Sequence, residues 1–125
     1  MSESMHKRFK ILIVDDEPRN LRILEKILEQ HELEKAVDGE QALQLLDEFK
    51  PELILLDGMM PGMSGIDVCE KLKMDEKYQH IKIIIVSGKA SEVDFKEAAE
   101  VGADGYVTKP FTVDELLTAV QRVVS

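Results

Sequence analysis

The stretch "ELILLDGMMPGMSG", Glu52 to Gly65, shows how this chain is built. Four consecutive apolar residues, Leu53 to Leu56, run directly into Asp57, and a loop containing Pro and Gly follows. A short continuous apolar run is typical of a strand buried on both faces of a parallel sheet. The carboxylate that follows such a strand is expected at the C-terminal edge of the sheet.

Apolar runs of the same character occur at four other positions. Each is short, is rich in apolar or β-branched residues, and is separated from the next by a more polar segment. They are Lys10 to Val14, Leu33 to Val37, Ile83 to Val86 and Gly105 to Val107, of which the second is the weakest.

Segments with the apolar spacing of amphipathic helices follow these runs. In the first, Leu21, Leu24 and Leu28 recur at i, i+3 and i+7, which places them on one helix face. The other expected faces comprise Ala42, Leu43, Leu46 and Phe49; Val68, Cys69 and Leu72; the weakest, Phe95, Ala98 and Ala99 within Ser91 to Val101; and Val113, Leu116, Leu117 and Val120. Repeated strand-helix alternation predicts an α/β fold, an open parallel sheet with helices on both faces.

Composition and charge restrict the function classes. A chain of 125 residues, 44% hydrophobic and 33% charged, has the size and composition of one globular domain. The formal net charge of −9 argues against binding to nucleic acid or to an anionic membrane, so proteins or a small cation are the expected partners. Residues 1–8 are expected to form a flexible leader without a signal-peptide core, and Cys69 is the single cysteine, so a cytoplasmic location is expected.

Polar residues follow four of the expected strands. Asp15 and Asp16 follow the first, Asp57 the third, Ser87 the fourth, and Lys109 lies just beyond the fifth. Parallel strands share one C-terminal edge, where ligands of open α/β sheets bind, so these side chains are expected to converge in one shallow pocket. Each could separately be a helix cap, turn residue or surface residue, but a shared site accounts for all of them together.

The blocks that carry these residues resemble the receiver domain of two-component response regulators. They are "ILIVDDEP", "LILLDGMMPGMSG", "IIIVSGK" and "GADGYVTKPF", and the resemblance extends from Phe9 to Val124. It implies a single receiver domain over residues 9–125, with a (βα)5, doubly wound, flavodoxin-like sheet of strand order 2-1-3-4-5. Helices 1 and 5 are then expected on one face of the sheet, and helices 2, 3 and 4 on the other.

The resemblance assigns a phosphoacceptor and a metal site. Asp57 takes the position of the phosphorylated residue, and Asp15 and Asp16 that of the acidic pair that binds Mg²⁺, with Mn²⁺ as the alternative ion. Asp16 and Asp57 are expected as direct ligands, Asp15 as a ligand through water, and Met59 as a ligand through its backbone carbonyl. Because three clustered carboxylates repel one another without a cation, at least one is expected to have a raised pKa.

The resemblance also assigns the residues around the phosphoryl group. Lys109 is expected to bind it, Ser87 to move its hydroxyl onto it, and Tyr106 to rotate inward behind Ser87. The peptide bond between Lys109 and Pro110 is expected to be cis. Movement of these groups is expected to change the surface formed by helix 4, strand 5 and helix 5.

The expected function is a phosphoacceptor switch in a phosphorelay rather than a metabolic enzyme. The phosphoryl donor is expected to be a sensor histidine kinase or a histidine phosphotransfer protein, and the domain catalyses only its own phosphorylation and dephosphorylation. The target is a downstream protein or an output domain, with a phosphorylation-linked homodimer as a further form. Helix 1 and the adjoining loops are expected to face the donor.

Each alternative function can be compared with the residues that it would require in this sequence. A small phosphatase of the haloacid-dehalogenase type needs a second Asp two positions after the nucleophile, where Met59 stands. A receiver-fold scaffold that acts unphosphorylated usually lacks a site residue, and none is missing here. A flavodoxin is disfavoured because the first strand leads into "DDEP" rather than a phosphate-binding loop.

Other conspicuous residues are interpreted as structural. Met59, Met60 and Met63 are expected in packing and loop positions, because no Cys or His accompanies them, and Cys69 is expected in the core. Asp38 and Gly39 are interpreted as a turn, and the three histidines, His6, His31 and His80, are expected at the surface. Met59 and Lys89 flank the route of water to Asp57, so they are expected to slow hydrolysis of the phosphoryl group.

Overall fold

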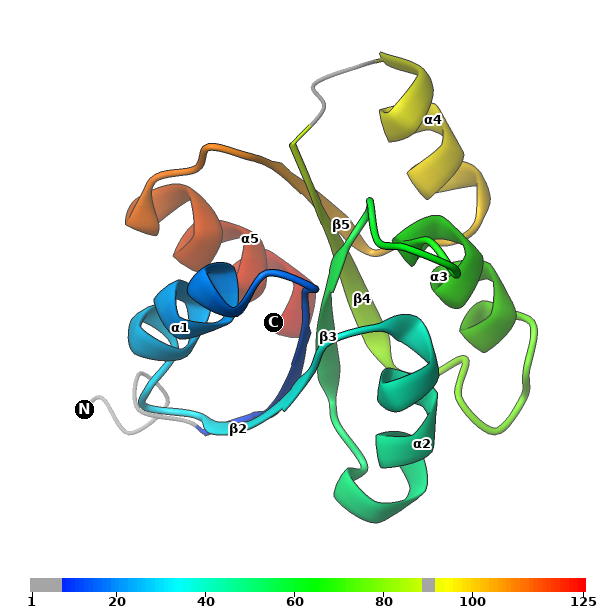
Figure 1. Ribbon diagram of the computed structural model, residues 1–125, viewed down its shortest axis with the longest axis horizontal. Helices are drawn as coiled ribbons and strands as arrows, with labels where there is room; N and C mark the ends of the chain where they lie inside the picture. Colours follow the sequence, from blue (N-terminus) through cyan, green and yellow to red (C-terminus); the bar gives the residue numbers. More distant parts are fainter. Residues whose placement is uncertain (1–7, 89–91) are drawn as a thin grey trace.

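Five parallel strands form one sheet in the order β2-β1-β3-β4-β5, as the sequence predicts (Figure 1). The computed structural model describes residues 8–88 and 92–125. The strands are β1 (Lys10–Val14), β2 (Glu32–Ala36), β3 (Leu53–Asp57), β4 (Lys82–Ser87) and β5 (Gly105–Thr108). The helices are α1 (Pro18–Ile27), α2 (Gly39–Phe49), α3 (Gly65–Lys73), α4 (Glu92–Glu100) and α5 (Val113–Val124).

Two apolar cores, one on each face of the sheet, explain the continuous apolar runs. Successive side chains of a strand point to opposite faces, so Ile11 and Ile13 of β1 pack with α1 and α5, whereas Leu12 and Val14 pack with α2, α3 and α4. Every residue of β3 is buried. Figure 1 shows α1 and α5 on one side of the sheet and α2, α3 and α4 on the other, which confirms the predicted layers.

Strand bounds differ from the sequence-based expectation by one residue. The edge strand β2 begins and ends one residue earlier than expected, because Ala36 is buried whereas Val37 is 45% exposed. At their C-terminal ends, strands β3, β4 and β5 each continue one residue further than expected. Their last residues are Asp57, Ser87 and Thr108. Two polar side chains of the candidate site are therefore fixed by sheet pairing rather than by loops.

The helix faces of α4 and α5 are less buried than their sequences suggest. Of the side chains described in α4, at 95–100, only Ala98 is buried, so the expected burial of Phe95 and Ala99 is wrong. Among the side chains described at 95–100, the methyl group of Ala98 is the part that belongs to the core. In α5, Leu116 and Val120 are buried as expected, whereas Val113 and Leu117 lie at the surface.

Side-chain caps fix where three helices begin. Asp38 accepts a hydrogen bond from the backbone N–H of Gln41 at 2.8 Å, so the expected turn is the N-cap of α2. Ser64 and Asp67 form a capping box at α3, and Thr112 and Glu115 form another at α5. These caps hold the two helices that directly follow β3 and β5, the strands that carry Asp57 and lead to Lys109.

His31 is buried, and the expectation of a surface position for it is wrong. Its side chain is 8% exposed, its Nδ1 accepts the backbone N–H of Phe9 at 3.1 Å, and the two rings lie 5.6 Å apart. A neutral imidazole can accept such a bond, and burial lowers the pKa of His31. Cys69 lies in the core as expected. His6 lies outside the described residues.

In the described ranges, no helix combines the length and the apolar character that a membrane crossing requires.

Candidate functional site

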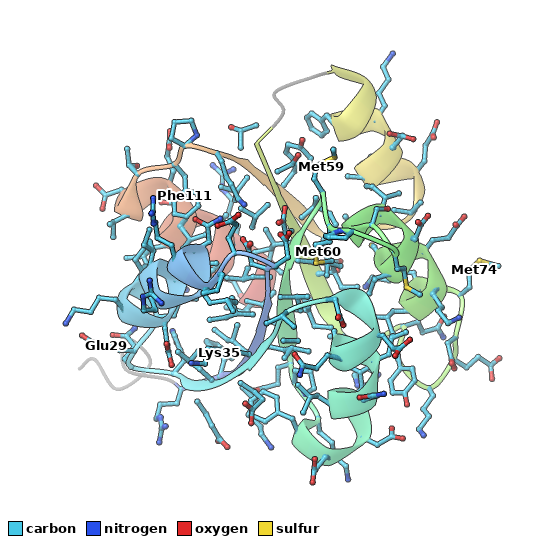
Figure 2. All side chains as sticks on the ribbon, in the orientation of Figure 1. Glu29, Lys35, Met59, Met60, Met74 and Phe111 are labelled. Carbon is cyan, nitrogen blue, oxygen red and sulfur yellow. The ribbon has the colours of Figure 1, made fainter. Side chains whose placement is uncertain are left out.

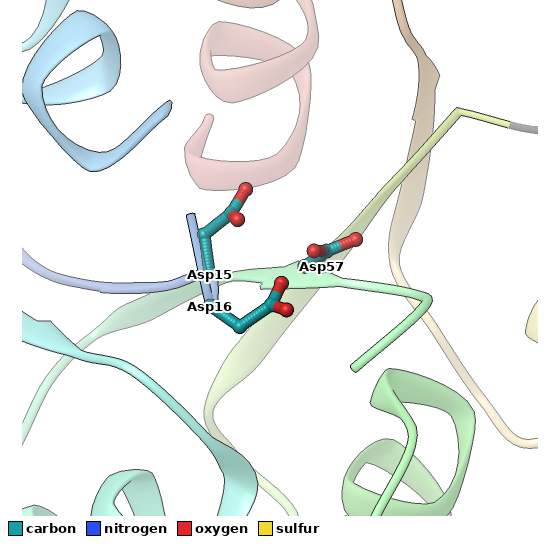
Figure 3. A group of neighbouring side chains, drawn as sticks. All are labelled: Asp15, Asp16 and Asp57. Carbon is teal, nitrogen blue, oxygen red and sulfur yellow. The ribbon is translucent and has the colours of Figure 1, made fainter. Parts of the chain in front are cut away.

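Three carboxylates meet at the C-terminal edge of the sheet (Figure 3). One oxygen from each of Asp15, Asp16 and Asp57 lies within 4.8 Å of the others. The register explains this placement: β1 and β3 are neighbours, with Val14 opposite Leu56, so the residues that follow these two lie side by side. The predicted convergence of the acidic residues is present in the structure.

Lys109 brings the positive charge into this group. Its Nζ lies 3.1 Å from Asp15 Oδ2 and 3.7 Å from Asp57 Oδ1. Its backbone N–H donates to the carbonyl of Ser87 at 2.7 Å, and its peptide bond to Pro110 is cis. The lysine is therefore held between the two buried carboxylates by the continuation of the β4–β5 pairing.

Asp15 is buried and hydrogen-bonded through both oxygens. Oδ1 accepts the backbone N–H of Glu17 at 2.9 Å and lies 3.5 Å from Asn20 Nδ2, while Oδ2 faces Lys109. Asn20 is a site residue that the sequence analysis missed. The sequence signal that could have identified Asn20 was its position in the first turn of α1, four residues after Asp16.

The surroundings of Asp57 perturb its pKa. It is 5% exposed, and its Oδ1 accepts the backbone N–H of Met59 at 3.1 Å. Burial raises the pKa of Asp57 to about 6, with the Met59 hydrogen bond opposing the rise and the charge of Asp15 adding to it. The expected raised pKa is confirmed, but loss of hydration is a larger cause than the repulsion from which it was predicted.

The loop after Asp57 approaches the strand closely, and glycine makes this approach possible. A Cβ placed on Gly65 would lie 2.2 Å from the backbone oxygen of Asp57. A Cβ on Gly58 would lie 3.3 Å from Ser87 Cβ. Gly58 and Gly65 therefore allow the chain around Asp57 to pack closely against itself and against Ser87.

Ser87 and Tyr106 line a common cavity beside Asp57. Ser87 ends β4 and is 3% exposed, and Tyr106 lies opposite Ile85 on β5. The cavity has a volume of about 190 Å³ and is also lined by Gly58 and Met59. Tyr106 therefore has space on the side facing Ser87.

Met59 and Met60, both labelled in Figure 2, follow Asp57 and Gly58 in the chain but differ in burial. Met59 is 55% exposed at the mouth of the site, whereas Met60 is 8% exposed and belongs to the core on the side of the sheet covered by α2, α3 and α4. Met63 packs against the same core. These are the packing and loop positions that the sequence predicts, and Lys89 lies outside the described residues.

The donor set fits a hard divalent cation. Three carboxylates supply oxygen ligands within one small region, and Mg²⁺ or Mn²⁺ prefers oxygen over nitrogen or sulfur. A cation would also offset the unfavourable proximity of the negative charges. The site residues are thus compatible with a divalent metal.

A family model described as "Response regulator receiver domain" matches residues 11–121. This chain belongs to the response regulator receiver domain family. The receiver domain serves two-component signalling and is not a metabolic enzyme, so the phosphatase alternative is not favoured.

Individual proteins agree with this assignment. The receiver domain is 42% identical to the DNA-binding response regulator MtrA of Mycolicibacterium smegmatis over 116 residues, 91% of this chain and 50% of MtrA. It is 41% identical to the phosphate regulon transcriptional regulatory protein PhoB of Pseudomonas aeruginosa over 116 residues, 91% of this chain and 51% of PhoB. The chain thus spans about half the length of these curated relatives.

A solved structure supports the fold. The chemotaxis protein CheY4 of Vibrio cholerae superimposes with a TM-score of 0.87 at 30% identity, covering 94% of this chain and 99% of that chain. The chain therefore shares its overall fold with the solved CheY4 structure.

Proposed function

We propose that Asp57 is the phosphoacceptor of this receiver domain and takes a phosphoryl group from a phosphohistidine donor. The observation that carries the proposal is the placement of Asp57: it is buried at the end of a central strand, with Lys109 Nζ at 3.7 Å and two further carboxylates beside it. A rigid carboxylate facing a cation and an oxygen-rich site suits in-line phosphoryl transfer.

The transfer forms one bond and breaks one bond. A carboxylate oxygen of Asp57 attacks phosphorus, the P–N bond to the donor imidazole breaks, and the electron pair returns to that nitrogen. Attack places negative charge beside negative charge, so Lys109 stabilises the phosphoryl oxygens as they approach. Asp57 must be ionised to attack, which its pKa of about 6 permits at neutral pH.

A divalent metal is proposed as part of this site. Asp16 and Asp57 would hold it directly, Asp15 through water, and Met59 through its backbone carbonyl. When bound, the ion supplies charge neutralisation for the transferring phosphoryl group. Mg²⁺ is the proposed ion and Mn²⁺ the alternative.

The proposed signal is a change at the face formed by α4, β5 and α5. An acyl phosphate adds nearly two negative charges and three acceptor oxygens next to Ser87. The Ser87 hydroxyl donates to one of these oxygens, and Tyr106 then moves into the cavity beside Ser87. A downstream protein, an output domain or a second copy of the chain reads the altered face.

The proposed donor is a sensor histidine kinase or a histidine phosphotransfer protein in the cytoplasm. A mostly apolar groove of about 380 Å³ lies beside Asp15 and Lys109, with Ile23 and Leu24 of α1 on one side and Phe111 on the other. This groove offers the donor a docking place next to Asp15 and Lys109, the two residues that adjoin Asp57. With a net charge of −9, the domain itself is proposed to act on proteins, although relatives are named as DNA-binding regulators.

Intact mass measurement after incubation with acetyl phosphate tests the proposal. We expect one added phosphoryl group in the presence of Mg²⁺, none in EDTA, and none in Asp57→Asn. Asp75→Asn is the matched control, because Asp75 lies in the loop between α3 and β4, at the opposite edge of the sheet from Asp57, and it should be phosphorylated normally. A folded, Mg²⁺-binding wild type that gains no phosphoryl group from acetyl phosphate or from a panel of histidine kinases would favour the unphosphorylated scaffold instead.

A further inference from the structure

Tyr106 lies between two hollows of the structure. On one side is the cavity of about 190 Å³ that it shares with Ser87. On the other is a groove of about 260 Å³ between α4 and β5, lined by Phe95, Ala98, Ala99 and Ala103. The ring of Tyr106 can therefore move from one hollow to the other without displacing the core of the sheet.

Phe95 holds Tyr106 on the α4 side. The two rings stack with their centroids 5.4 Å apart and an interplanar angle of 12°. This is an offset stacked pair, which aromatic rings prefer over a face-to-face sandwich. The Phe95 side chain is 56% exposed, so its contact with Tyr106 is made at the surface and not in the core.

The same pair connects α4 to the sheet. Ala98 is the only buried side chain among those described at 95–100, so this part of α4 contributes little to the core. The stack with Tyr106 is therefore one of the contacts that position this part of α4 against β5. Movement of the Tyr106 ring toward Ser87 breaks the stack and leaves one face of Phe95 uncovered.

We propose that Phe95 is a positioning residue that acts through Tyr106: the stack keeps the Tyr106 ring out of the cavity beside Ser87 and so sets the balance between the two states of the switch. This inference rests on the proposed function. Loss of the stacking interaction shifts that balance about 2- to 10-fold toward the inward ring. Because coupling is reciprocal, a partner that binds Phe95 more tightly in one of the two states shifts the phosphorylation equilibrium by the same factor by which phosphorylation changes the affinity of that partner.

Tyrosine-labelled NMR of the unphosphorylated protein tests the position of the ring directly. The chain has two tyrosines, so Tyr78 serves as the internal reference. In Phe95→Leu, which keeps an apolar side chain without a ring, we expect the Tyr106 signals to lose their ring-current shift and the contacts from Tyr106 to Ser87 to strengthen. Phe95→Trp, which keeps an aromatic face, should retain the wild-type contacts.

Binding of beryllofluoride in the presence of Mg²⁺ tests the consequence for the switch at equilibrium. We expect Phe95→Leu to bind about 2- to 10-fold more tightly than the wild type. Met74→Leu is the matched control, because Met74 is an exposed apolar residue at the C-cap of α3 and lines neither of the two hollows beside Tyr106. It should bind as the wild type does.

The two proposals fail in different ways. If Phe95→Leu matches Met74→Leu both in its Tyr106 spectrum and in its affinity, the positioning role of Phe95 is overturned. If the wild type neither binds beryllofluoride nor accepts a phosphoryl group, the proposed function is overturned, while the spectrum of the unliganded protein still reports whether Phe95 holds Tyr106.

Discussion

At the scale of single residues, Asp57 lowers the stability of the fold that holds it. Its pKa rises from an ordinary 3.8 to about 6 on folding, so between these values the folded protein binds more protons than the unfolded chain. The free energy of unfolding therefore falls as the pH rises from about 4 to about 6. At neutral pH and without metal the cost is about 2–3 kcal/mol.

Asp57→Asn should remove this cost. We expect the metal-free variant to be about 2–3 kcal/mol more stable than the wild type at pH 7 and to differ little from it near pH 4. Urea unfolding in EDTA at both pH values measures the difference. Millimolar Mg²⁺ should stabilise the wild type more than the variant, and equal stability of the two proteins at pH 7 in EDTA would contradict the assignment of a destabilising charge.

His31 gives a pH dependence of the opposite sign. Burial lowers its folded pKa below the ordinary 6.5, so the unfolded chain binds more protons as the pH falls through 6.5. The stabilising contribution of neutral His31 is complete above this pH and is lost below it. His31→Gln, which keeps an acceptor for the Phe9 N–H without titrating, should flatten the stability profile between pH 5 and pH 7 in unfolding experiments, whereas an unchanged slope would exclude the effect.

The residues of the site could be predicted to different extents. Asp15, Asp57 and Lys109 were identifiable because buried strands are visible as apolar runs and their C-terminal ends must share one edge. Asn20 was missed, and the burial of His31, which lies outside the site, was not predicted, because an amide or an imidazole finds its partner through tertiary contacts that have no sequence period. The principal cause of the raised pKa of Asp57 was also missed, since burial of a residue at a strand end depends on the layers around it.

At the scale of elements, Lys73 joins α3 to the two strands that follow it. Its Nζ donates to the backbone oxygen of Ile81 at 2.7 Å and lies 2.9 Å from Asp104 Oδ2, which in turn accepts the N–H of Ile83 at 2.9 Å. The side chain of Lys73 is only 16% exposed, so removal of its charge leaves acceptors without their donor in a partly dry environment.

Lys73→Met should destabilise the protein by about 1–3 kcal/mol. Lys77→Met is the control: Lys77 pairs with Asp47 at the surface, where both side chains are more than 60% exposed, and such a pair contributes about 0–1 kcal/mol. Urea unfolding of both variants at neutral pH makes the comparison. Equal losses would show that the connection through Lys73 adds nothing beyond a surface ion pair.

The elements differ in how far sequence alone defines them. Strands β1, β3 and β4 are central and buried, so their runs are unmistakable, whereas the edge strand β2 has one buried residue and its bounds shifted by one. Helix α4 has only a weak apolar stripe, and among its side chains described at 95–100 only that of Ala98 is buried. The contact that Phe95 makes instead, with Tyr106, depends on the separation of α4 from β5 and could not be predicted from spacing.

At the scale of the whole molecule, charge opposes self-association while apolar residues favour it. Two copies each carry a net charge of −9 and repel one another over about 10 Å at 0.1 M salt. Phe95 of α4 and Val113 and Leu117 of α5 are nevertheless exposed on the face that phosphorylation is proposed to change. Burial of these side chains in a homodimer would offset the repulsion only when the face is rearranged.

This balance makes a salt-dependent prediction. Sedimentation analysis of the protein with beryllofluoride and Mg²⁺ should show more dimer at about 0.5 M NaCl than at about 0.1 M, because screening removes the repulsion and leaves apolar burial. Leu117→Glu should abolish this dimer, while Ile23→Glu, a similar change at an exposed position of α1, outside the face formed by α4, β5 and α5, should not. Dimer that weakens with salt would contradict an association driven by apolar burial against charge repulsion. Dimer that survives Leu117→Glu but not Ile23→Glu would place the association on the α1 face instead, where it would compete with the phosphoryl donor.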